Sequence, residues 1–553
     1  MSQIQTSLQS VARAPLLWVL IPWMTGFWLA DRFDEIDPIT FGWIALAGTV
    51  SSLTFTRLPW WSMAFFVGAT GAGSLYYSAL EGPFRAKEPF TAMPVRELEL
   101  TFEVTRVFDR EDPYARVSGI AEIRETPSVR QDLLGKRVYF FLRNKGKDLP
   151  PVISKGAHVR ASGLLTPCAR QVRKGFEKYL LNAGVAYQFH RGVVLEMNKP
   201  PSWFGRFCRA GNEKLEMVLR HGGAESSTLA DVGVAMTLGK KSALSDEQKD
   251  RYVATGVMHL FAISGLHVGV VATVLAFILR WSPGPKWLEA LCGLVLLFIY
   301  VEITGGNPSA RRAFLMVVFW WGARLLGRPG SSLPALTASA LVALLLEPRE
   351  MWNLGFQLSY SVVASIILYG VPLASRLQTA WQPWAYLPPQ DRSILQRCSL
   401  LVWKWFSGAL CVSFAATLAS APLVMVHFGV FTPGAILLNV FLVLLAGLAI
   451  ICGFASIICG VTALTFLSAV INHGQWALLA LMDVLVGLFH AIPGLFLRVE
   501  VTSLTMASAV LVITMTIFMV LVHRISVAAS WICLLPLLPL CFLFFFATES
   551  VAQ

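Results

Sequence analysis

His259 and His267 flank a Ser264-Gly265 dipeptide inside an apolar stretch that otherwise has the character of a membrane helix. The glycine and the polar side chains should break this helix, and the apolar run then resumes to Leu279. A break leaves backbone groups without helical partners, which hydrocarbon tolerates only inside protein or beside water. We therefore expect the functional site of a membrane protein at this break, with the four residues at its centre.

Metal chemistry is not expected from the two histidines. On an unbroken helix, side chains eight residues apart differ by about 80° in azimuth, so His259 and His267 would not converge on one ion. No HxHxDH, HExxH or DxH motif accompanies them in the sequence. We therefore expect no metal, no cofactor and no catalytic residue. A membrane hydrolase that uses Ser264 with a histidine stays an alternative.

The sequence GKKS at 239–242 resembles the end of a P-loop but departs from it twice. Five residues rather than four separate Gly233 from Gly239, and Lys241 occupies the position at which serine or threonine binds magnesium. We expect no ATP site here. Instead, Lys240 and Lys241 should lie at a membrane surface and contact phosphates of lipid or of a substrate.

Polar side chains also interrupt three later apolar segments. They are Glu302, Asn307, Arg311 and Arg312 at the junction of two apolar spans, Gln357 and Ser359 in another span, and Asn439 in a third. A charge inside a bilayer costs roughly 2.5–3.5 kcal/mol, so such residues normally face a cavity or a partner. We interpret them as the lining of a hydrated path, in which two adjacent arginines would suit phosphate groups. The alternative is internal salt bridging, for example of Glu302 with Arg311 or Arg312.

The elements that position these residues should be membrane helices. Of the 553 residues, 55% are hydrophobic and only 14% are charged, against roughly 25% charged in soluble domains. The expected fold class is a polytopic α-helical membrane protein with an extracytoplasmic small β-barrel insert. Candidate spans lie near residues 15–30, 39–56, 59–79, 260–280, 287–303, 309–326, 333–346, 355–377, 402–424, 432–464 (two short elements), 474–493, 503–523 and 526–547.

A soluble insert follows the third span. Residues 81–220 hold 25 lysines and arginines against 16 acidic residues, which suits a polyanion or simply a solvated surface. Short alternating segments near 98–104, 138–142, 159–164 and 193–197 predict strands of a small barrel, with an OB fold as the leading candidate. The function of the barrel stays open, because its β-strands are compatible both with a structural cap and with a module that binds single-stranded nucleic acid.

The charges around the first spans predict the orientation of the insert. Arg13 and Arg57 should lie in the cytoplasm and the acidic loop 31–37 outside, which places the insert in the periplasm or outside the cell. Residues 200–220 should form an amphipathic helix in the membrane interface. Seven of the nine cysteines lie in or beside apolar segments, and whether Cys168 and Cys208 form a disulfide stays open.

We expect five consecutive domains. They are N-terminal transmembrane helices at 1–81, an OB-like β domain at 82–199, an amphipathic interfacial helix at 200–225, a channel domain at 226–500 and C-terminal transmembrane helices at 501–553.

Several strings in the chain together resemble the competence-domain family of ComEC, the membrane channels of natural transformation. They are GKKSALS at 239–245, YVATG at 252–256, HLFAISGLH at 259–267, GG at 305–306, PSARRA at 308–313, GFQLS at 355–359, AP at 421–422, Pro433 with Asn439, and GFEKYL at 175–180 with Gly184. The resemblance extends from the first span to about residue 500. The HLFAISGLH string is highly specific, whereas each polar membrane residue alone is weak.

The resemblance implies an inner-membrane channel that moves one DNA strand from the periplasm to the cytoplasm. It implies single-stranded DNA and membrane lipid as partners, with a periplasmic DNA receptor and a cytoplasmic DNA-translocating helicase. The DNA path would run past His259, Ser264, Gly265, His267, Glu302, Arg311, Arg312, Gln357, Ser359 and Asn439. Bases would stack on aromatic residues of the insert, most of which we expect in the barrel core; they are Tyr139, Phe140, Phe141, Tyr179, Tyr187 and Phe189.

The chain departs from the family pattern in two places. It ends without the C-terminal metallo-β-lactamase-like domain of many members, so a separate nuclease is expected. The usual FDY string reads Phe176-Glu177-Lys178 here. The alternative function outside the enzymes is a small-solute or ion transporter, which should show a repeat between its halves, and no clear repeat is present.

Overall fold

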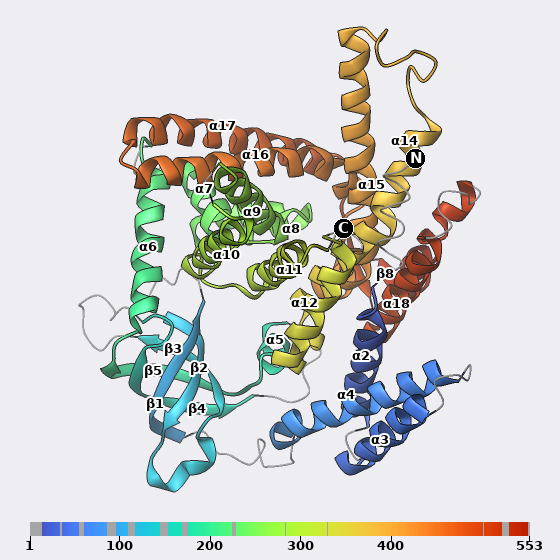
Figure 1. Ribbon diagram of the computed structural model, residues 1–553. Coiled ribbons are helices and arrows are strands. Elements are labelled where there is room, and N and C mark those ends of the chain that lie inside the picture. Colours follow the sequence, from blue (N-terminus) through green and yellow to red (C-terminus); the bar gives the residue numbers. More distant parts are fainter. Residues whose placement is uncertain are drawn as a thin grey trace.

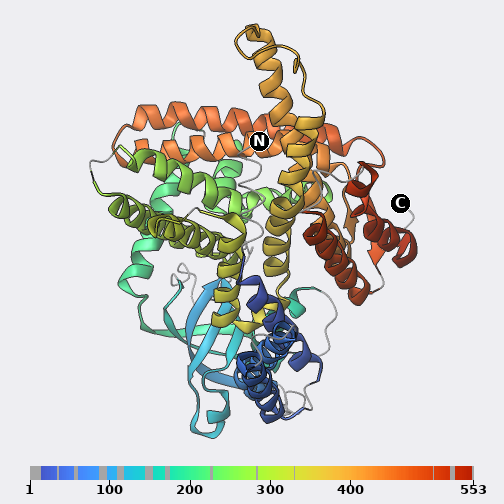
Figure 2. The same ribbon diagram turned by 45° about the vertical axis from the view of Figure 1, so that its right-hand side comes forward.

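The computed structural model describes residues 14–33, 36–54, 60–85, 96–108, 117–143, 153–168, 175–223, 228–281, 284–328, 330–501, 503–522 and 530–550. Within these ranges the protein has parts of two architectures. A β-barrel and the N-terminal helices lie at one end, and the helices of residues 228–550, here called the bundle, lie above them (Figure 1, Figure 2). The predicted helical membrane fold with a small barrel is confirmed.

Three apolar helices come first, close to the predicted bounds. They are α2 (Leu17–Arg32), α3 (Pro38–Thr54) and α4 (Trp61–Arg85). Glycines let α3 and α4 approach closely, because a Cβ atom on Gly48 would lie only 2.4 Å from the backbone of Gly68. Arg13 and Arg57, on which the orientation rests, lie outside the described residues, so the orientation stays a prediction.

Five strands close into a barrel in the order β1-β2-β3-β5-β4. They are β1 (Arg96–Val107), β2 (Val117–Glu125), β3 (Arg137–Arg143), β4 (His158–Pro167) and β5 (Val185–Lys199). β3 and β5 pair in parallel, and all other neighbours are antiparallel. A closed five-stranded barrel of this kind has the OB architecture, as predicted.

The barrel core consists of large apolar side chains from the inner faces of the strands. Phe102, Phe140 and Phe189 have no exposed area, and the ring centroid of Phe102 lies 5.5 Å from that of Phe140 and 5.9 Å from that of Phe189. Phe140 and Phe189 therefore belong to the core, as expected for most of the aromatic residues of the insert.

β2 is missing from the predicted strands because it lacks polar alternation. Its residues 118–121 are all buried. A short helix, α5 (Phe176–Asn182), covers the outer face of the sheet here, and its Leu180 packs with Ile120 of β2 and Tyr139 of β3. A strand that is buried on both faces reads as a short apolar run, which periodicity alone does not identify.

The helix α6 (Trp203–Arg220) connects the barrel to the bundle and runs along one side of it (Figure 1). The bundle contains α7 (Thr228–Leu238), α8 (Asp246–Ala254), α9 (Gly265–Leu279), α10 (Lys286–Ile303), α11 (Pro308–Leu325), α12 (Ser332–Leu346), α13 (Leu354–Ser365), α14 (Val371–Ala380), α15 (Ile394–Phe428), α16 (Ala435–Val461), α17 (Thr465–His490), α18 (Leu504–Leu521) and α19 (Leu537–Ala547). Short strands β6 (Val430–Phe431), β7 (Leu497–Val501) and β8 (Thr548–Ser550) form a separate sheet in that order.

Five helical segments of the described chain are long and apolar enough to cross a membrane. They are Leu354–Ala380, Ile394–Phe428, Ala435–Val461, Thr465–His490 and Leu504–Leu521. The expectation of two short elements within 432–464 is wrong, because α16 is one continuous helix of 27 residues. α16 and α17 lie side by side across the top of Figure 1, crosswise to the long α15.

Candidate functional site

The break at Ser264-Gly265 is present, but the chain before it is not the apolar α-helix that the sequence predicts. Gly256 has a φ of +72° directly after α8, and a 3-10 helix (Met258–Phe261) and an extended segment lead on to Ser264. The left-handed φ, which glycine adopts without steric cost, ends the helical path. The resumption of the helix is confirmed, since α9 begins at Gly265.

His267 caps the start of α9 together with Ser264. The Ser264 backbone N–H donates to His267 Nδ1 at 3.3 Å, and Ser264 Oγ lies 3.1 Å from the same nitrogen. Because Nδ1 accepts, the neutral imidazole carries its proton on Nε2. The His267 side chain is fully buried, and its Nε2 has no hydrogen-bond partner of good geometry among the described residues.

His259 lies in a different setting from His267. Its side chain is exposed, and its Nδ1 lies 2.9 Å from the Gly256 carbonyl oxygen. The described residues contain no group of three or more histidine, cysteine, aspartate or glutamate side chains that could hold a metal ion. The two histidines thus serve different local purposes, one exposed on a turn and one at a buried helix start.

Glu302 forms the centre of a three-residue charge cluster where the barrel meets the bundle. Arg311 donates from Nε and Nη2 to Glu302 Oε1 at 3.0 and 2.6 Å, and Lys155 of the barrel reaches Glu302 Oε2 at 3.2 Å. The Glu302 side chain is 10% exposed, whereas that of Arg311 is 48% exposed. The salt bridge between Glu302 and Arg311, which the sequence left as an alternative, is therefore present, and Arg311 keeps a free outer side.

The turn that carries this cluster requires glycine. Gly305 and Gly306 have φ values of +94° and +58°. A Cβ atom on Gly306 would lie 2.8 Å from Arg311 Nη2 and 3.0 Å from Glu302 Oε1. The glycines therefore let the salt bridge lie directly against the turn between α10 and α11.

Arg312 points to a different acid from Arg311. Its Nη1 donates to Glu350 at 2.9 Å and its Nη2 donates to Ser359 Oγ at 3.2 Å. The Arg312 side chain is only 6% exposed. A buried arginine needs a paired acid, because an uncompensated charge away from water is costly. The adjacent arginines thus contact different elements, since Arg311 pairs with Glu302 of α10 and Arg312 contacts Glu350 and Ser359.

Three helices of the bundle begin in the same region. A Cβ atom on Gly239 would lie 2.8 Å from the Ile263 side chain and 3.8 Å from Asn307 Nδ2, so the start of α9 and the start of α11 are neighbours. Gly355, at the start of α13, lies against the Arg312 guanidinium. Helix N-termini carry partial positive charge and unpaired N–H groups, so three of them together favour an anion.

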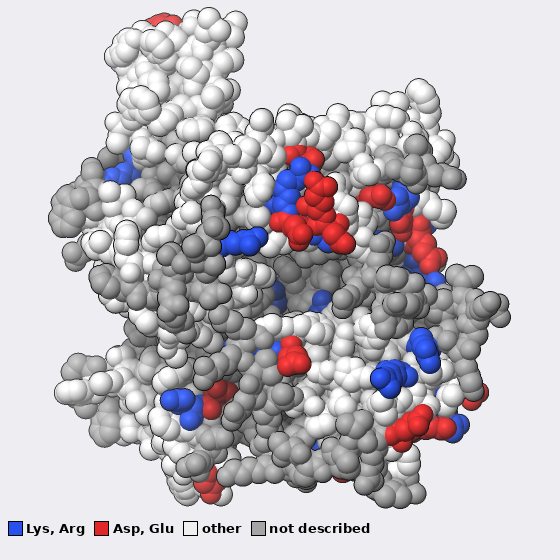
Figure 3. All heavy atoms as spheres, turned by 180° about the vertical axis from the view of Figure 1, so that it is seen from behind, with Lys and Arg blue, Asp and Glu red and all other residues white. Residues whose placement is uncertain are grey.

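The face opposite that of Figure 1 is hollowed near its middle, at about the height where the barrel meets the bundle (Figure 3). Lysine or arginine atoms are visible in the depth of this hollow (Figure 3). At Gly265, Gly269 and Gly305 an added Cβ atom would meet no other atom within 4 Å. The region around the helix starts therefore has open space beside its backbone.

Arg106, at the end of β1, belongs to the region where the barrel meets the bundle, here called the junction. Arg106 donates to Tyr179 Oη at 2.7 Å and to Asn307 Oδ1 at 3.2 Å, which ties the barrel directly to the start of α11. Its guanidinium also lies 5.3 Å from the Phe108 ring centroid. Burial raises the pKa of Tyr179, and the positive charge of Arg106 opposes that rise.

Aromatic side chains gather around Arg106. Phe176 stacks on Tyr179 at 5.8 Å and meets Tyr139 edge-on at 5.2 Å and Phe108 edge-on at 5.8 Å. Phe176 is 49% exposed, although it is large and apolar. We call Arg106, Phe108, Tyr139, Phe176 and Tyr179 the aromatic platform. It lies on the outer side of the barrel and adjoins Asn307.

The segment 347–353 between α12 and α13 connects three parts of the protein. Glu347 pairs with Arg137 of the barrel at 3.1 Å, and the Trp352 carbonyl accepts from Asn182 of α5 at 2.8 Å. Arg349 pairs with Glu81 of α4. Because Glu350 of the same segment holds Arg312, the barrel, the N-terminal helices and the helix starts share one scaffold.

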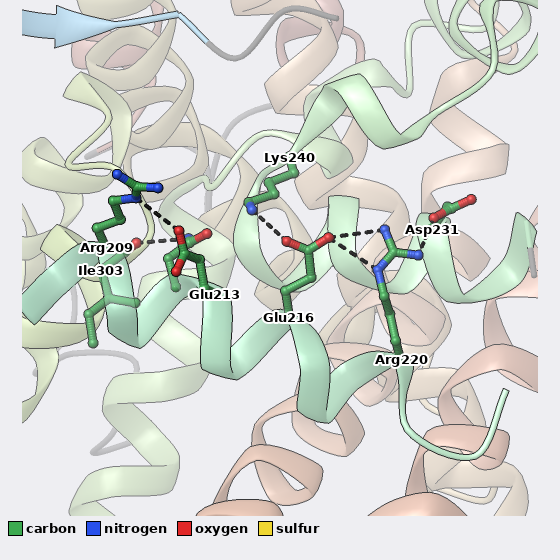
Figure 4. Close-up of polar contacts among 8 residues, drawn as sticks. Arg209, Glu213, Glu216, Arg220, Asp231, Lys240 and Ile303 are labelled. Carbon is green, nitrogen blue, oxygen red and sulfur yellow. Dashed lines mark hydrogen bonds and ion pairs between the residues drawn. The ribbon is translucent and has the colours of Figure 1, made fainter. Parts of the chain in front are cut away.

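Lys240 is already paired inside the protein. Its Nζ lies 2.6 Å from Glu216 of α6, and the same carboxylate contacts Arg220, which also pairs with Asp231 at 2.5 Å (Figure 4). The predicted phosphate contact of Lys240 stays a prediction. Lys241 lies in a 3-10 helix (Lys241–Ala243), and its side chain is outside the described residues.

The amphipathic α6 contacts the bundle through buried leucines, Leu215 and Leu219, and through polar side chains. Besides the Glu216 network, Asn212 donates to the Ile303 carbonyl at 2.9 Å, and Arg209 pairs with Glu213 at 2.8 Å along the helix (Figure 4). Trp203, by contrast, is 72% exposed. The helix itself is confirmed, and its place in the membrane interface stays a prediction.

The two remaining predicted residues are not joined to these clusters. Gln357 donates to the Met351 carbonyl at 3.0 Å and so stabilises the turn before α13. Asn439 lies in α16, and its Oδ1 is buried without a hydrogen-bond partner among the described residues. The structure thus brings Glu302, Arg311, Arg312 and Ser359 near one junction. Gln357 and Asn439 do not take part in the hydrogen bonds of those four residues.

Sequence reasoning missed several residues of the junction. Arg106 and Glu350 each contact a residue from a distant part of the chain, so no local spacing identifies them, whereas Asn307 was already visible as a polar residue at the junction of two apolar spans. Phe176 did carry a signal, because it stands in the string that resembles the FDY motif. Cys168 is a free buried thiol, and Cys208 is also free. Burial raises the pKa of Cys168 to about 11.

Fold and site together define a polytopic helical membrane protein whose OB-type barrel contacts the starts of several bundle helices. The chain belongs to the family described as Competence protein, whose profile matches residues 236–525. This match confirms the resemblance given above.

Three curated relatives are similar to parts of the chain. ComE operon protein 3 of Bacillus subtilis is 31% identical over 210 residues, 38% of this chain and 24% of the relative. Recombination protein 2 of Haemophilus influenzae is 23% identical over 316 residues, 56% of this chain and 37% of the relative. Competence protein ComA of Neisseria gonorrhoeae is 31% identical over 143 residues, 24% of this chain and 20% of the relative. The matches thus span well under half of each relative, and no solved structure matches.

Proposed function

We propose that the chain is an inner-membrane channel that moves single-stranded DNA from the periplasm to the cytoplasm during natural transformation. Membership of the competence protein family supports a role in DNA uptake. The relatives named as competence and recombination proteins point the same way. The barrel would face the periplasm and receive the strand, and the bundle would conduct it.

The observation that carries the proposal is the contact between the aromatic platform and the helix starts. Single-stranded nucleic acid is held by base stacking on aromatic rings and by phosphate contacts to positive groups. The platform offers the exposed ring of Phe176, and Arg106 beside it reaches Asn307 at the start of α11. A strand lying here would place its bases on the barrel and its phosphates toward the helix N-termini.

Arg311 is accessible enough to contact the DNA strand, whereas Arg312 is suited to stabilise the packing around Glu350. Half of the Arg311 side chain is exposed, so an arriving phosphate can share it with Glu302. Arg312 is nearly inaccessible and is paired with Glu350. We therefore assign the phosphate contact to Arg311 and a positioning role to Arg312.

The hydrolase alternative rests on the 3.1 Å contact between Ser264 Oγ and His267 Nδ1. A nucleophilic serine normally needs a histidine whose second nitrogen is oriented by a third group. Among the described residues, the backbone of Met236 lies near the His267 ring, but His267 Nε2 has no hydrogen-bond partner of good geometry. Capping of α9 explains the pair without catalysis, so transport of DNA is the better account.

The proposal is tested by scoring labelled DNA in the periplasm and in the cytoplasm separately. Phe176→Ala and Arg106→Gln should leave periplasmic uptake unchanged and lower cytoplasmic entry about tenfold, since each stacked base contributes about 1–3 kcal/mol. Phe466→Ala is the matched control, because Phe466 is 82% exposed on α17. Normal cytoplasmic entry in folded Phe176 and Arg106 variants would contradict the assigned site.

A further inference from the structure

A basic surface pocket lies at the end of α11 that is remote from the barrel. It has a volume of about 420 Å³ and is lined by Trp320, Arg324, Gly327, Arg328 and Gly330. α11 has 18 residues and is therefore about 27 Å long, close to the roughly 30 Å thickness of the hydrocarbon layer. The pocket and the junction thus lie about one membrane thickness apart.

The two arginines of the pocket are available for an external anion. Arg324 and Arg328 are both exposed, and within the described ranges neither has a salt-bridge partner. The Arg324 guanidinium lies 5.0 Å from the Trp320 ring centroid, which holds the charge at the mouth of the pocket. An added Cβ atom on Gly330 would lie 3.0 Å from Trp320 Nε1 and 3.1 Å from Arg324 Cγ, so glycine keeps the pocket open.

Apolar side chains beside the pocket point to a lipid rather than to a polyanion in water. Leu325 is 43% exposed and Leu326 is 79% exposed, and both are adjacent in sequence to the pocket arginine Arg324. Tryptophan and basic side chains next to exposed leucines are typical of the membrane interface. A strand of nucleic acid or free phosphate would gain nothing from these leucines.

We propose that this pocket binds the phosphate headgroup of an anionic phospholipid in the leaflet that faces away from the barrel. Arg324 and Arg328 donate to the phosphate oxygens, since the guanidinium fork matches phosphate geometry. Trp320 lies at headgroup depth, and the acyl chains lie along Leu325 and Leu326. This site does not depend on DNA transport, so it can be tested without it.

The test is a lipid titration of the purified full-length protein in a neutral detergent, with the thermal unfolding midpoint as the readout. Phosphatidylglycerol should raise the midpoint at much lower concentration than phosphatidylcholine. Arg324→Gln/Arg328→Gln should weaken phosphatidylglycerol binding about 30-fold, the effect of two basic groups at an anionic surface. Arg124→Gln/Arg160→Gln is the matched control, because it removes two exposed charges from the barrel.

Several results would overturn the proposal. Equal binding of the two lipids, or unchanged phosphatidylglycerol binding by the double variant, would show that the pocket is not an anionic-lipid site. Displacement of the lipid by inorganic phosphate or by an oligothymidylate at equal concentration would assign the pocket to a soluble anion instead. If the double variant does not fold, the single variants Arg324→Gln and Arg328→Gln replace it, each with about fivefold weaker binding expected.

Discussion

The arginines at the two ends of α11 differ in whether they have acidic partners. At the barrel end, Arg311 pairs with Glu302 and Arg312 pairs with Glu350. At the far end, Arg324 and Arg328 are exposed and have no acidic partner within the described ranges. The same residue type therefore serves two purposes, one at each end of α11. The paired arginines fix the geometry of the junction, whereas the arginines without an acidic partner are available to bind an anionic ligand.

The comparison also separates the two adjacent arginines of the barrel end. Arg312 is buried and is held through Glu350 in the segment that also contacts the barrel and α4. Arg311 is half exposed and shares its acid with Lys155. Accessibility, rather than residue type, decides which of the two can meet a phosphate. Variants of Arg312 and of Arg311 should therefore differ in their effects on stability and on DNA transport.

The largest expected effect is on stability, at Arg312. Arg312→Ala leaves Glu350 without its partner, and breaking a buried ion pair costs about 3–5 kcal/mol of unfolding free energy. The unfolding midpoint in detergent is the measurement. The double variant Arg312→Ala/Glu350→Ala should recover part of the loss, because no charge is left uncompensated. A single variant as stable as the native protein would contradict the assigned role.

A smaller stability effect is expected at Arg311, together with a transport effect. The Arg311 side chain is half exposed, and Lys155 stays paired with the largely buried Glu302 carboxylate, so Arg311→Gln should cost about 1 kcal/mol. Cytoplasmic entry of labelled DNA should nevertheless fall, because the accessible phosphate contact is lost. Arg209→Gln is the control, since it also breaks a partly exposed pair but lies on α6. Full cytoplasmic entry in a folded Arg311→Gln protein would remove Arg311 from the path.

The smallest stability effect is expected at the far end of α11. Without added lipid, Arg324→Gln/Arg328→Gln should unfold within about 0.5 kcal/mol of the native protein, because exposed side chains without acidic partners contribute little to stability. The measurement is the same thermal unfolding. A loss comparable to that of Arg312→Ala would show that these arginines have partners within the protein, and the contrast between the two ends would fail.

Local patterns predicted most of the helices and the barrel. Long apolar runs mark α10, α11, α12 and α15 because each of them is one continuous helix. The Gly305-Gly306 turn and the break before α9 were visible as glycine next to polar residues. β2 escaped prediction because α5 covers its outer face, which removes the alternation that identifies a half-buried strand.

The pair of Glu302 with Arg311 was foreseen as an alternative, but partners from distant parts of the chain could not be predicted. Glu350 follows Arg312 by 38 residues, and Asn307 follows Arg106 by 201 residues. Such pairs form only when the barrel and the bundle are assembled. The sequence did identify Glu302 and Arg311 of one cluster and Arg312 of the other, since a charge in an apolar segment stands out whatever its partner is.

We propose that a single DNA strand passes between the aromatic platform and the start of α9. This proposal is tested most directly by placing a photo-crosslinking amino acid at Phe176, at Gly265 or at Gly474 and irradiating cells during uptake of labelled DNA. Gly265 and Gly474 both have open space around them, but Gly474 lies on α17, where the nearby Asn472 contacts Val218 and His221 at the end of α6 that is remote from the barrel. The account predicts crosslinks to single-stranded DNA at 176 and 265 and none at 474. Crosslinks to double-stranded DNA, equal labelling at 474, or no crosslink at 176 and 265 would contradict it.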